Sequence, residues 1–382
     1  MSFEFATAGR ILFGAGTVER AAEETRSIGN RIFVVTGKTE DRARPLLDRL
    51  GGAAVSTFHV QGEPTTVSTI EAVSAARRFN ADAVVGIGGG SALDTGKVVA
   101  ALMTNDGDLM DYLEVIGGAR PLKRRPVPYL ALPTTAGTGA EVTRNAVIDS
   151  PEHAVKVSMR SPLMLPALAV VDPDLTRSLP PEATAGTGMD ALTQLLEAFV
   201  SAKANPLTDG ICREGLQRAA GWLRRACAAG DDMTARENMA LASLFGGLAL
   251  ANAKLGAVHG FAAPVGAALS IPHGVVCGRL LAPVMAANIR ALRERDPEGD
   301  ALDRYAKTAR ILTRDPDAGP EAGAAWVQSL CADLPLPDLS AFGLTADHVP
   351  DLVAKAARAS SMKGNPIALT ESELSGILMT VL

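Results

Sequence analysis

The chain has 382 residues, of which 47% are hydrophobic and 21% are charged, and its formal net charge is −5 at pH 7. This composition excludes an intrinsically disordered protein, and the length allows two domains that each have a core of their own. Lysine and arginine are scattered rather than clustered, so nothing predicts a surface for nucleic acid.

The four cysteines show no CxxC spacing, which argues against a zinc knuckle or a redox pair. We interpret Cys212, Cys227, Cys277 and Cys331 as reduced thiols of a cytoplasmic protein. The first residues, MSFEFATAGRILFG, include Glu4 and lack a continuous apolar core, so they do not have the form of a signal peptide. No uncharged apolar run reaches the roughly 20 residues that a bilayer requires, and we expect no membrane partner.

The first half of the chain alternates strand and helix signals, which is the pattern of a parallel α/β sheet. Short β-branched runs predict buried strands, and apolar residues at helical spacing predict helices. The expected strands are 31–36, 53–60, 83–87, 127–132 and 168–171, and the expected helices are 43–50 and 66–79. Two extended pieces, 146–148 and 154–158, flank the turn DSPE and predict a hairpin.

A glycine-rich turn, Gly88-Gly89-Gly90-Ser91, follows the strand at 83–87 and leads into a helix that we expect to end near Met103. Successive glycines let the backbone approach a ligand, and a helix start offers free N–H groups that suit a phosphate. The turn is neither a Walker loop nor a complete GxGxxG fingerprint. It is either a phosphate cradle or a place where strand and helix pack tightly.

A second loop with hydroxyls and glycines, PTTAGTGAEVT, begins at Pro133 where the strand at 127–132 ends. Ligands of α/β sheets bind at the carboxyl ends of the strands. The loop is therefore predicted to form part of the same binding site.

Beyond Leu179-Pro180-Pro181 the strand signal stops and helical patterns follow. The expected helices are 182–201, 206–229, 233–251, a short one from 259, 274–293 and several weaker ones up to residue 382. We expect the polar, Pro/Gly-dotted stretch 300–320 to include a mobile surface loop. The sequence thus predicts an α/β domain over 1–180 and an all-helical domain over 181–382.

Two of the five histidines, His259 and His273, are each followed by glycine and are separated by apolar and small residues. Asp190 lies in an apolar helical run, and Gln194 follows it on the same helix face. One carboxylate and two imidazoles are enough for a catalytic metal, and a buried carboxylate needs such compensation. The alternative is that Asp190 caps or salt-bridges locally and that both histidines are hydrogen-bonded core residues.

Four stretches occur in the order GGGSALDTGK, PTTAGTGAEVT, GMDALTQLLEAFVS and HGFAAPVGAALSIPHG. Together they resemble the signatures of the iron-containing (group III) alcohol dehydrogenase family over almost the whole chain. The resemblance implies a Rossmann-like domain for NAD or NADP, a helical domain that carries one divalent metal, and an active site in the cleft between them. It implies reversible hydride transfer between the nicotinamide and a small alcohol or aldehyde, with the metal as Lewis acid.

The same resemblance assigns individual residues. Positions that match the cofactor site are Gly37, Gly88, Gly89, Gly90, Ser91, Thr134, Thr135 and Thr138, and positions near both cofactor and substrate are Asn145 and Lys156. Three matched metal ligands, which act in catalysis through the metal, are Asp190, His259 and His273.

This sequence departs from the family pattern at the metal site. Iron-dependent members usually have histidine four residues after the aspartate, where this chain has Gln194, whose amide oxygen is a weaker and harder donor. The related glycerol dehydrogenases resemble this chain in using one Asp and two His for zinc. We therefore expect Asp190, His259 and His273 to hold Fe, Zn, Ni or Mn, with Gln194 coordinating or beside the metal.

Two further departures concern the proton path and the cofactor. Ala263 occupies a position where many members have a histidine that relays the alcohol proton, so the path is unassigned. Many NAD-preferring members have aspartate after the strand at 31–36, where its carboxylate would repel the 2′-phosphate of NADP. This chain has Gly37 and Lys38 there, so NADP should be tolerated. The alternative is that Gly37 is simply a turn residue. Arg144 either binds an acidic group of the substrate or pairs with an acid of the protein.

Two rival functions fit parts of the sequence: a non-catalytic nucleotide-binding protein with a decayed metal site, and a cyclase of the dehydroquinate synthase type. The motif forms PTTAGTGAEVT and GMDALT are more similar to those of the alcohol dehydrogenases. The family often forms dimers or larger assemblies, so we expect a homo-oligomer, most simply a dimer.

Overall fold

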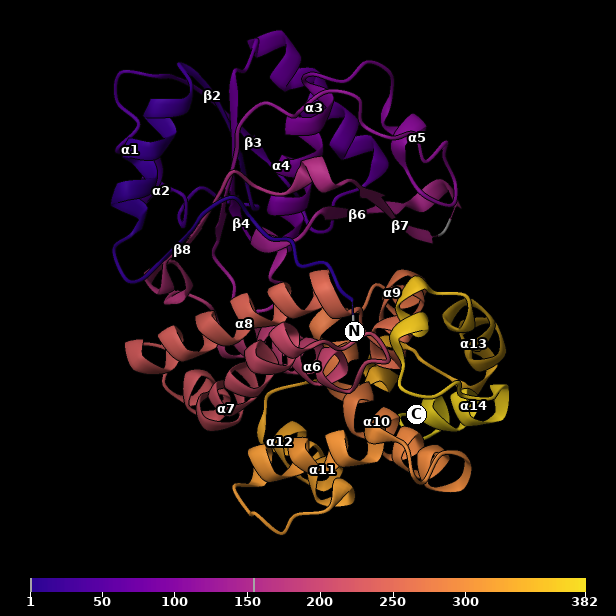
Figure 1. Ribbon diagram of the computed structural model, residues 1–382. Helices are drawn as coiled ribbons and strands as arrows, with labels where there is room; N and C mark the ends of the chain where they lie inside the picture. Colours follow the sequence, from indigo (N-terminus) through magenta and orange to yellow (C-terminus); the bar gives the residue numbers. More distant parts are fainter. Residues whose placement is uncertain (1, 154) are drawn as a thin grey trace. The chain divides into compact units, whose positions relative to one another are not determined.

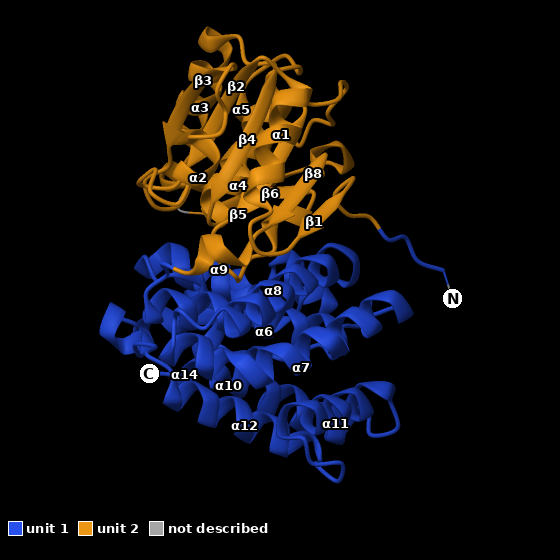
Figure 2. Ribbon diagram, turned by 90° about the vertical axis from the view of Figure 1, so that its left-hand side faces the viewer, with its two compact units in different colours: residues 1–5, 178–382 blue, residues 6–177 orange. Residues whose placement is uncertain are grey.

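The computed structural model describes residues 2–153 and 155–382. The chain divides into two compact units, one of Ala6–Arg177 and the other of Met1–Phe5 with Ser178–Leu382 (Figure 2). The first unit contains the sheet, and the second contains helices α6 to α14.

A six-stranded parallel sheet forms the centre of the first unit, as predicted. Across the sheet the strands are β1 (Ile11–Phe13), β8 (Leu168–Val171), β5 (Tyr129–Pro133), β4 (Ala83–Gly88), β2 (Arg31–Thr36) and β3 (Ala54–His59). Alternate side chains of β2 enter different cores, Ile32 and Val34 on one face and Phe33 and Val35 on the other. Both faces are therefore covered, and the central strands read as continuous apolar runs.

Helices cover the two faces of the sheet (Figure 1). One face carries α1 (Val18–Ile28) and α2 (Arg44–Leu47), and the other carries α3 (Thr66–Phe79), α4 (Gly90–Leu102) and α5 (Leu109–Tyr112). Local chemistry sets the start of α3, because the Thr65 hydroxyl accepts from the Ser68 N–H at 3.0 Å. The helix ends at Asn80, which adopts a left-handed conformation with φ of 53°.

The predicted hairpin is present as β6 (Asn145–Ser150) and β7 (Val155–Arg160), which pair antiparallel. Ala154, the first residue of the second expected strand, lies outside the described residues. Ala146 and Ile148 of β6 and Val157 and Met159 of β7 are buried in the core that also holds α3 and α4.

The second unit is helical. Its helices are α6 (Pro181–Val200), α7 (Pro206–Ala228), α8 (Met233–Ala253), α9 (Ala257–Leu269), α10 (His273–Arg295), α11 (Asp300–Thr313), α12 (Pro320–Asp333), α13 (Val349–Ala357) and α14 (Glu371–Met379). Helix α6 is buried along most of its length and packs against α7, α8 and α10. The residues on α6 are thus shielded by three other helices.

Within the stretch 300–320, which was expected to include a mobile surface loop, α11 occupies Asp300–Thr313. Tyr305, Ala309 and Leu312 recur at helical spacing and are buried, so packing outweighs the polar composition. Only the residues between α11 and α12 form the loop.

One helix and one bent pair of helices in the described chain are long and apolar enough to cross a membrane: α10, and α8 with α9. The apolar segment of α10 is 72% buried inside the protein, and α10 contains the charged Arg279. A helix covered to this extent by its neighbours is typical of a protein core.

Candidate metal and cofactor sites

Helices α6 and α10 come very close at a pair of glycines. A Cβ atom on Gly274 would lie 2.1 Å from the carbonyl oxygen of Gly186, so no side chain fits there. This contact places the first two turns of α10, with His273 and Cys277, beside the middle of α6, where Asp190 lies. The glycine that follows His273 in the sequence therefore has a packing reason.

Helix α9 begins at side chains from elsewhere in the unit. The N–H of Ala257 donates to Oδ1 of Asn365 at 3.1 Å, and the N–H of Val258 donates to Oε1 of Glu197 at 2.7 Å. These bonds satisfy N–H groups that a helix start leaves free. They also fix the position of His259 in the first turn of α9.

Glu197 holds the His259 ring as well. Its Oε2 lies 2.7 Å from Nδ1 of His259, so the proton on Nδ1 is donated to the carboxylate and Nε2 faces Asp190. Nε2 is 3.2 Å from Oδ1 of Asp190. Two acceptor atoms so close need a proton or a cation between them, and a carboxylate behind an imidazole is the usual arrangement for a metal-binding histidine.

Four side chains converge at this point. The ligand atoms of Asp190, His259, His273 and Cys277 all lie within 4.8 Å of one another. The three residues predicted as ligands are thus brought together, and Cys277 joins them although the sequence analysis gave it no role. The available signal was its spacing of four residues after His273, which places both on one face of a helix.

Gln194 lies beside this cluster and contacts its carboxylate. Its Nε2 donates to Oδ1 of Asp190 at 3.2 Å. The Gln194 side chain also packs near Gly246, where an added Cβ would meet its Oε1 at 2.9 Å. In this arrangement Gln194 orients Asp190 with its donor end.

The neighbours within the cluster favour the ionised forms of Asp190 and His259 over their neutral forms. Burial opposes ionisation of Asp190, but the facing imidazoles of His273 and His259 and the Gln194 amide hold its pKa below the usual range. Burial also opposes a charge on His259, yet Cys277, Asp190 and Glu197 raise its pKa well above the usual value. The carboxylate therefore stays ionised and requires positive charge next to it.

The donor set fits a divalent transition-metal ion. Imidazole nitrogen, carboxylate oxygen and thiolate sulfur are the donors that such ions prefer, whereas Mg²⁺ and Ca²⁺ prefer oxygen alone. The ionised Asp190 carboxylate requires a cation beside it. The close approach of its Oδ1 to Nε2 of His259 indicates that the cation lies at this place.

The predicted cofactor residues gather where the order of strands changes direction. In the sheet, β2 and β4 are neighbours. From β2 the chain continues to β3 at one edge of the sheet, and from β4 it continues to β5 in the opposite direction, so the switch point lies between β2 and β4. Dinucleotides bind at such switch points, outside the carboxyl ends of the strands. Gly37 follows β2, Gly88 ends β4, and the threonine loop follows β5.

Close packing explains two glycines of the turn. A Cβ on Gly88 would lie 2.7 Å from Cβ of Ala92 and 3.2 Å from the Gly37 nitrogen, and one on Gly90 would lie 2.9 Å from Cγ2 of Thr138. The packing interpretation therefore holds at both positions. Gly89 caps α4 and has no side chain to accept from the free N–H groups of its first turn, which leaves these groups for a ligand.

The remaining predicted residues of this unit lie around the same strand ends or on the hairpin. Thr134 is buried and its N–H donates to the Gly88 carbonyl at 2.8 Å, whereas Ser91, Thr135 and Thr138 are partly exposed. Asn145 begins β6 and is also partly exposed. Lys156, on β7, forms an ion pair with Glu63.

A buried lysine that the sequence analysis did not single out ties these pieces together. Nζ of Lys97 contacts Oδ1 of Asp94 at 3.1 Å, Oγ1 of Thr143 at 2.8 Å and the Asn145 carbonyl at 2.7 Å. The lysine thus joins α4 to the threonine loop and the hairpin. In the sequence, this residue could have been noticed because it is the last residue of the motif GGGSALDTGK.

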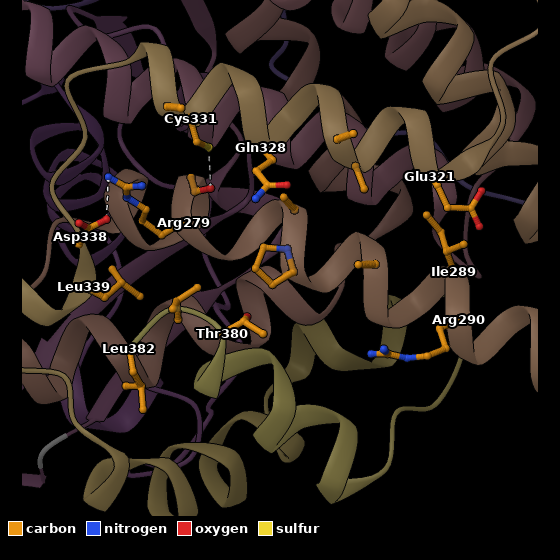
Figure 3. A pocket seen from close by; sticks show the side chains of 18 of the residues that line it. Arg279, Ile289, Arg290, Glu321, Gln328, Cys331, Asp338, Leu339, Thr380 and Leu382 are labelled. Atoms are coloured by element: carbon orange, nitrogen blue, oxygen red, sulfur yellow. Dashed lines mark hydrogen bonds and ion pairs between the residues drawn. The ribbon is translucent and has the colours of Figure 1, made fainter.

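The second unit also contains a hollow of about 940 Å³ along α10, α12 and the C-terminal residues (Figure 3). Its lining includes the ion pair of Arg279 with Asp338 and the Cys331 thiol, which donates to the Gly278 carbonyl at 3.1 Å. None of the four clustered side chains lines it.

Comparison with known proteins agrees with the fold. Residues 8–173 match the model of the iron-containing alcohol dehydrogenases, and residues 184–382 match the C-terminal model of the same family. The chain is 34% identical to alcohol dehydrogenase 4 of Schizosaccharomyces pombe, over 97% of this chain and 87% of the relative.

Solved structures of dehydrogenases and reductases have the same fold as this chain. A crystal structure of 1,3-propanediol oxidoreductase has a TM-score of 0.92 and 31% identity, with both chains covered to 100%. Sulfoacetaldehyde reductase from Bifidobacterium kashiwanohense in complex with NAD+ has a TM-score of 0.87 and 29% identity, over 100% of this chain and 99% of that one.

The parallel sheet and the helical unit thus define the α/β plus all-α architecture of the dehydrogenases that this chain resembles. The chain belongs to the iron-containing alcohol dehydrogenase family, as its four motifs predicted. It is an oxidoreductase that acts on CH–OH groups, and the predictions of fold, family and reaction class are confirmed.

Proposed function

We propose that this enzyme transfers a hydride reversibly between NAD(P) and a small alcohol or aldehyde at a divalent metal held by Asp190, His259 and His273. The observation that carries this proposal is the convergence of these three side chains, whose ligand atoms lie within 4.8 Å of one another. Residues 1–180 would bind the dinucleotide and residues 181–382 the metal.

The chain's own residues prepare the metal site. A divalent ion bound there supplies Lewis acidity, which favours loss of the alcohol proton and, in the reverse direction, polarises the carbonyl. Glu197 fixes the tautomer and the direction of the His259 ring, and Gln194 fixes the Asp190 carboxylate. Ligands held in this way lose little freedom when the ion binds.

The cofactor would lie at the ends of β2, β4 and β5. The first turn of α4 offers N–H groups to the pyrophosphate, and Ser91, Thr135 and Thr138 offer partly exposed hydroxyls beside it. The NAD+ complex of the sulfoacetaldehyde reductase supports a nicotinamide cofactor for this fold. Gly37 and Lys38 place no carboxylate after β2, so the proposal includes NADP.

We further propose a cytoplasmic homo-oligomer, most simply a dimer. The cysteines of the described chain are all free thiols, which supports a reducing compartment. Size-exclusion chromatography with light scattering gives the assembly directly, and a monomer would contradict this part of the proposal.

The proposal is tested with protein stripped of metal and reloaded with Zn, Fe, Ni or Mn. Short alcohols and aldehydes are assayed by nicotinamide absorbance with NAD(H) and with NADP(H). At least one metal should restore turnover, and His259→Ala and His273→Ala should each lower kcat/KM by more than about 10–100-fold, the cost of disturbing even an outer contact of such a site.

His153→Ala is the matched control, because His153 is exposed and belongs to the other unit. More than half of the activity left in both ligand variants would contradict the metal site. Binding of NAD(H) without turnover under any metal would favour a non-catalytic protein with a decayed metal site.

A further inference from the structure

We propose that the thiolate of Cys277 is a fourth protein ligand of this metal and that its sulfur makes the site select zinc over iron. The inference rests on the proposed metal site of Asp190, His259 and His273. It assigns to Cys277 a fourth coordination position on this ion.

The position of Cys277 is the first support. It is fully buried and lies one helical turn after His273 on α10. Its Sγ is 3.8 Å from Oδ1 of Asp190 and 3.9 Å from Nε2 of His259. The sulfur therefore faces the same point as the carboxylate and both imidazoles.

The spacing of the atoms is the second support. Tetrahedral zinc with bonds of about 2.0–2.3 Å places its ligand atoms about 3.3–3.8 Å apart. In the structure, Oδ1 of Asp190 lies 3.2 Å from Nε2 of His259 and 3.7 Å from Nε2 of His273, and the two sulfur contacts are 3.8 and 3.9 Å. At 3.7 Å, His273 and Asp190 are too far apart for a hydrogen bond, yet close to the distance between two ligands.

The competing donor is Gln194, and its amide is turned the wrong way. Nε2 of Gln194 donates to Asp190, and an N–H donor cannot bind a cation. To bind the ion through its oxygen, the amide would have to turn over and give up this hydrogen bond. Cys277 reaches the cluster without any such change.

The other buried cysteines show what an ordinary thiol does in this protein. Cys331 donates to the Gly278 carbonyl at 3.1 Å, and Cys212 lies within the apolar side of α7. Cys277 instead has a carboxylate and two imidazoles around its sulfur. A residue that serves only to fill a core would not need these neighbours.

A thiolate ligand has two chemical consequences. Soft thiolate sulfur favours zinc over Fe²⁺ more strongly than hard oxygen donors do. One carboxylate and one thiolate among the ligands also balance the two charges of the ion. Zinc accepts five ligands, so four from the protein are compatible with catalysis.

X-ray absorption at the zinc edge tests the inference on the zinc-loaded full-length protein. The wild type should show one sulfur at about 2.3 Å together with nitrogen and oxygen ligands. Cys277→Ser should lose the sulfur shell and keep the lighter ligands. Cys331→Ser is the control, because a hydroxyl can make the same bond to the Gly278 carbonyl, and it should keep the sulfur shell.

Competition between equal concentrations of Zn²⁺ and Fe²⁺ gives a second readout. The ratio of bound zinc to iron should fall by about tenfold or more in Cys277→Ser and stay unchanged in Cys331→Ser. A wild-type spectrum with only nitrogen and oxygen ligands, in a protein whose turnover still requires metal, would overturn the role of Cys277 and leave the proposed function intact. Failure of the wild type to bind any metal would overturn both.

Discussion

Glu141 shows how one residue can make stability depend on pH. It is 1% exposed, and among the described residues its Oε2 has no hydrogen-bond partner. Burial raises its pKa from 4.5 to about 7, against the smaller effects of its own backbone N–H and of Lys97. The folded protein therefore binds more protons than the unfolded chain between these two pKa values, and stability falls as pH rises through that window.

We expect the wild-type free energy of unfolding to fall by about 3 kcal/mol between pH 4.5 and pH 8 through this group. Glu141→Gln should lack that part of the pH dependence, as measured by urea unfolding at several pH values. Glu71→Gln, an exposed carboxylate on α3, is the control and should follow the wild type. Identical pH curves for wild type and Glu141→Gln would refute the assignment.

Glu197 would act on the proposed metal through His259 rather than by contact with it. In Glu197→Gln the amide oxygen can still accept from the Val258 N–H, but the amide nitrogen cannot accept from Nδ1 of His259. Zinc affinity, measured by competition with a chelator, should fall by about 10–100-fold. Glu214→Gln, which removes an exposed ion pair with Arg218, should not change it. Equal affinities in both variants would show that Glu197 only caps α9.

Gly37 offers a direct test of cofactor choice. A Cβ there would meet nothing within 4 Å, so Gly37→Asp should fold normally and place a carboxylate after β2. Repulsion of the 2′-phosphate should lower kcat/KM for NADPH by about tenfold relative to NADH, since like charges in a binding site cost free energy. A thousandfold preference of the wild type for NADH would already contradict tolerance of NADP.

At the scale of elements, the contact between α6 and α10 decides where the ligands lie. In Gly274→Ala the new Cβ would lie 2.1 Å from a backbone oxygen of α6, so the helices must move apart. We expect a loss of about 1–3 kcal/mol in stability from this overpacking. Because His273 and Cys277 move with α10, zinc affinity should fall as well.

Gly210→Ala on α7 is the matched helical control, because a Cβ there meets nothing within 4 Å. It should keep zinc affinity and gain about 0.5–1 kcal/mol of stability. Chemical unfolding and metal titration of both variants distinguish overpacking from a general effect of alanine. Unchanged metal affinity in Gly274→Ala would mean that the site does not depend on this contact.

At the scale of the molecule, the metal would tie together three helices that are far apart in the sequence. Ligands come from α6, α9 and α10, so removing the ion should destabilise the helical unit. At a metal concentration 100 times the Kd, binding stabilises by about 2.7 kcal/mol, and a chelator should lower Tm accordingly. Asp190→Asn should show little response to the chelator, and a full response there would place the ion elsewhere.

Much of the fold follows from short-range patterns. The strand Arg31–Thr36 and the helix Thr66–Phe79 match the predicted bounds because β-branched runs, helical spacing and the cap at Thr65 act within a few residues. β1 and α1 were missed, since Ile11–Phe13 is only three residues long and two of the four apolar residues of α1 are alanine.

The sequence by itself determined the family, the α/β and helical halves, and the three residues Asp190, His259 and His273, because motifs and periodicity are carried by neighbours in the chain. Only the tertiary structure decided that Cys277 and Glu197 belong with them. Glu197 is 62 residues from His259, and Cys277 is 87 residues from Asp190. Which side chains meet across such separations depends on how closely helices pack, and here glycine contacts and helix caps set that distance.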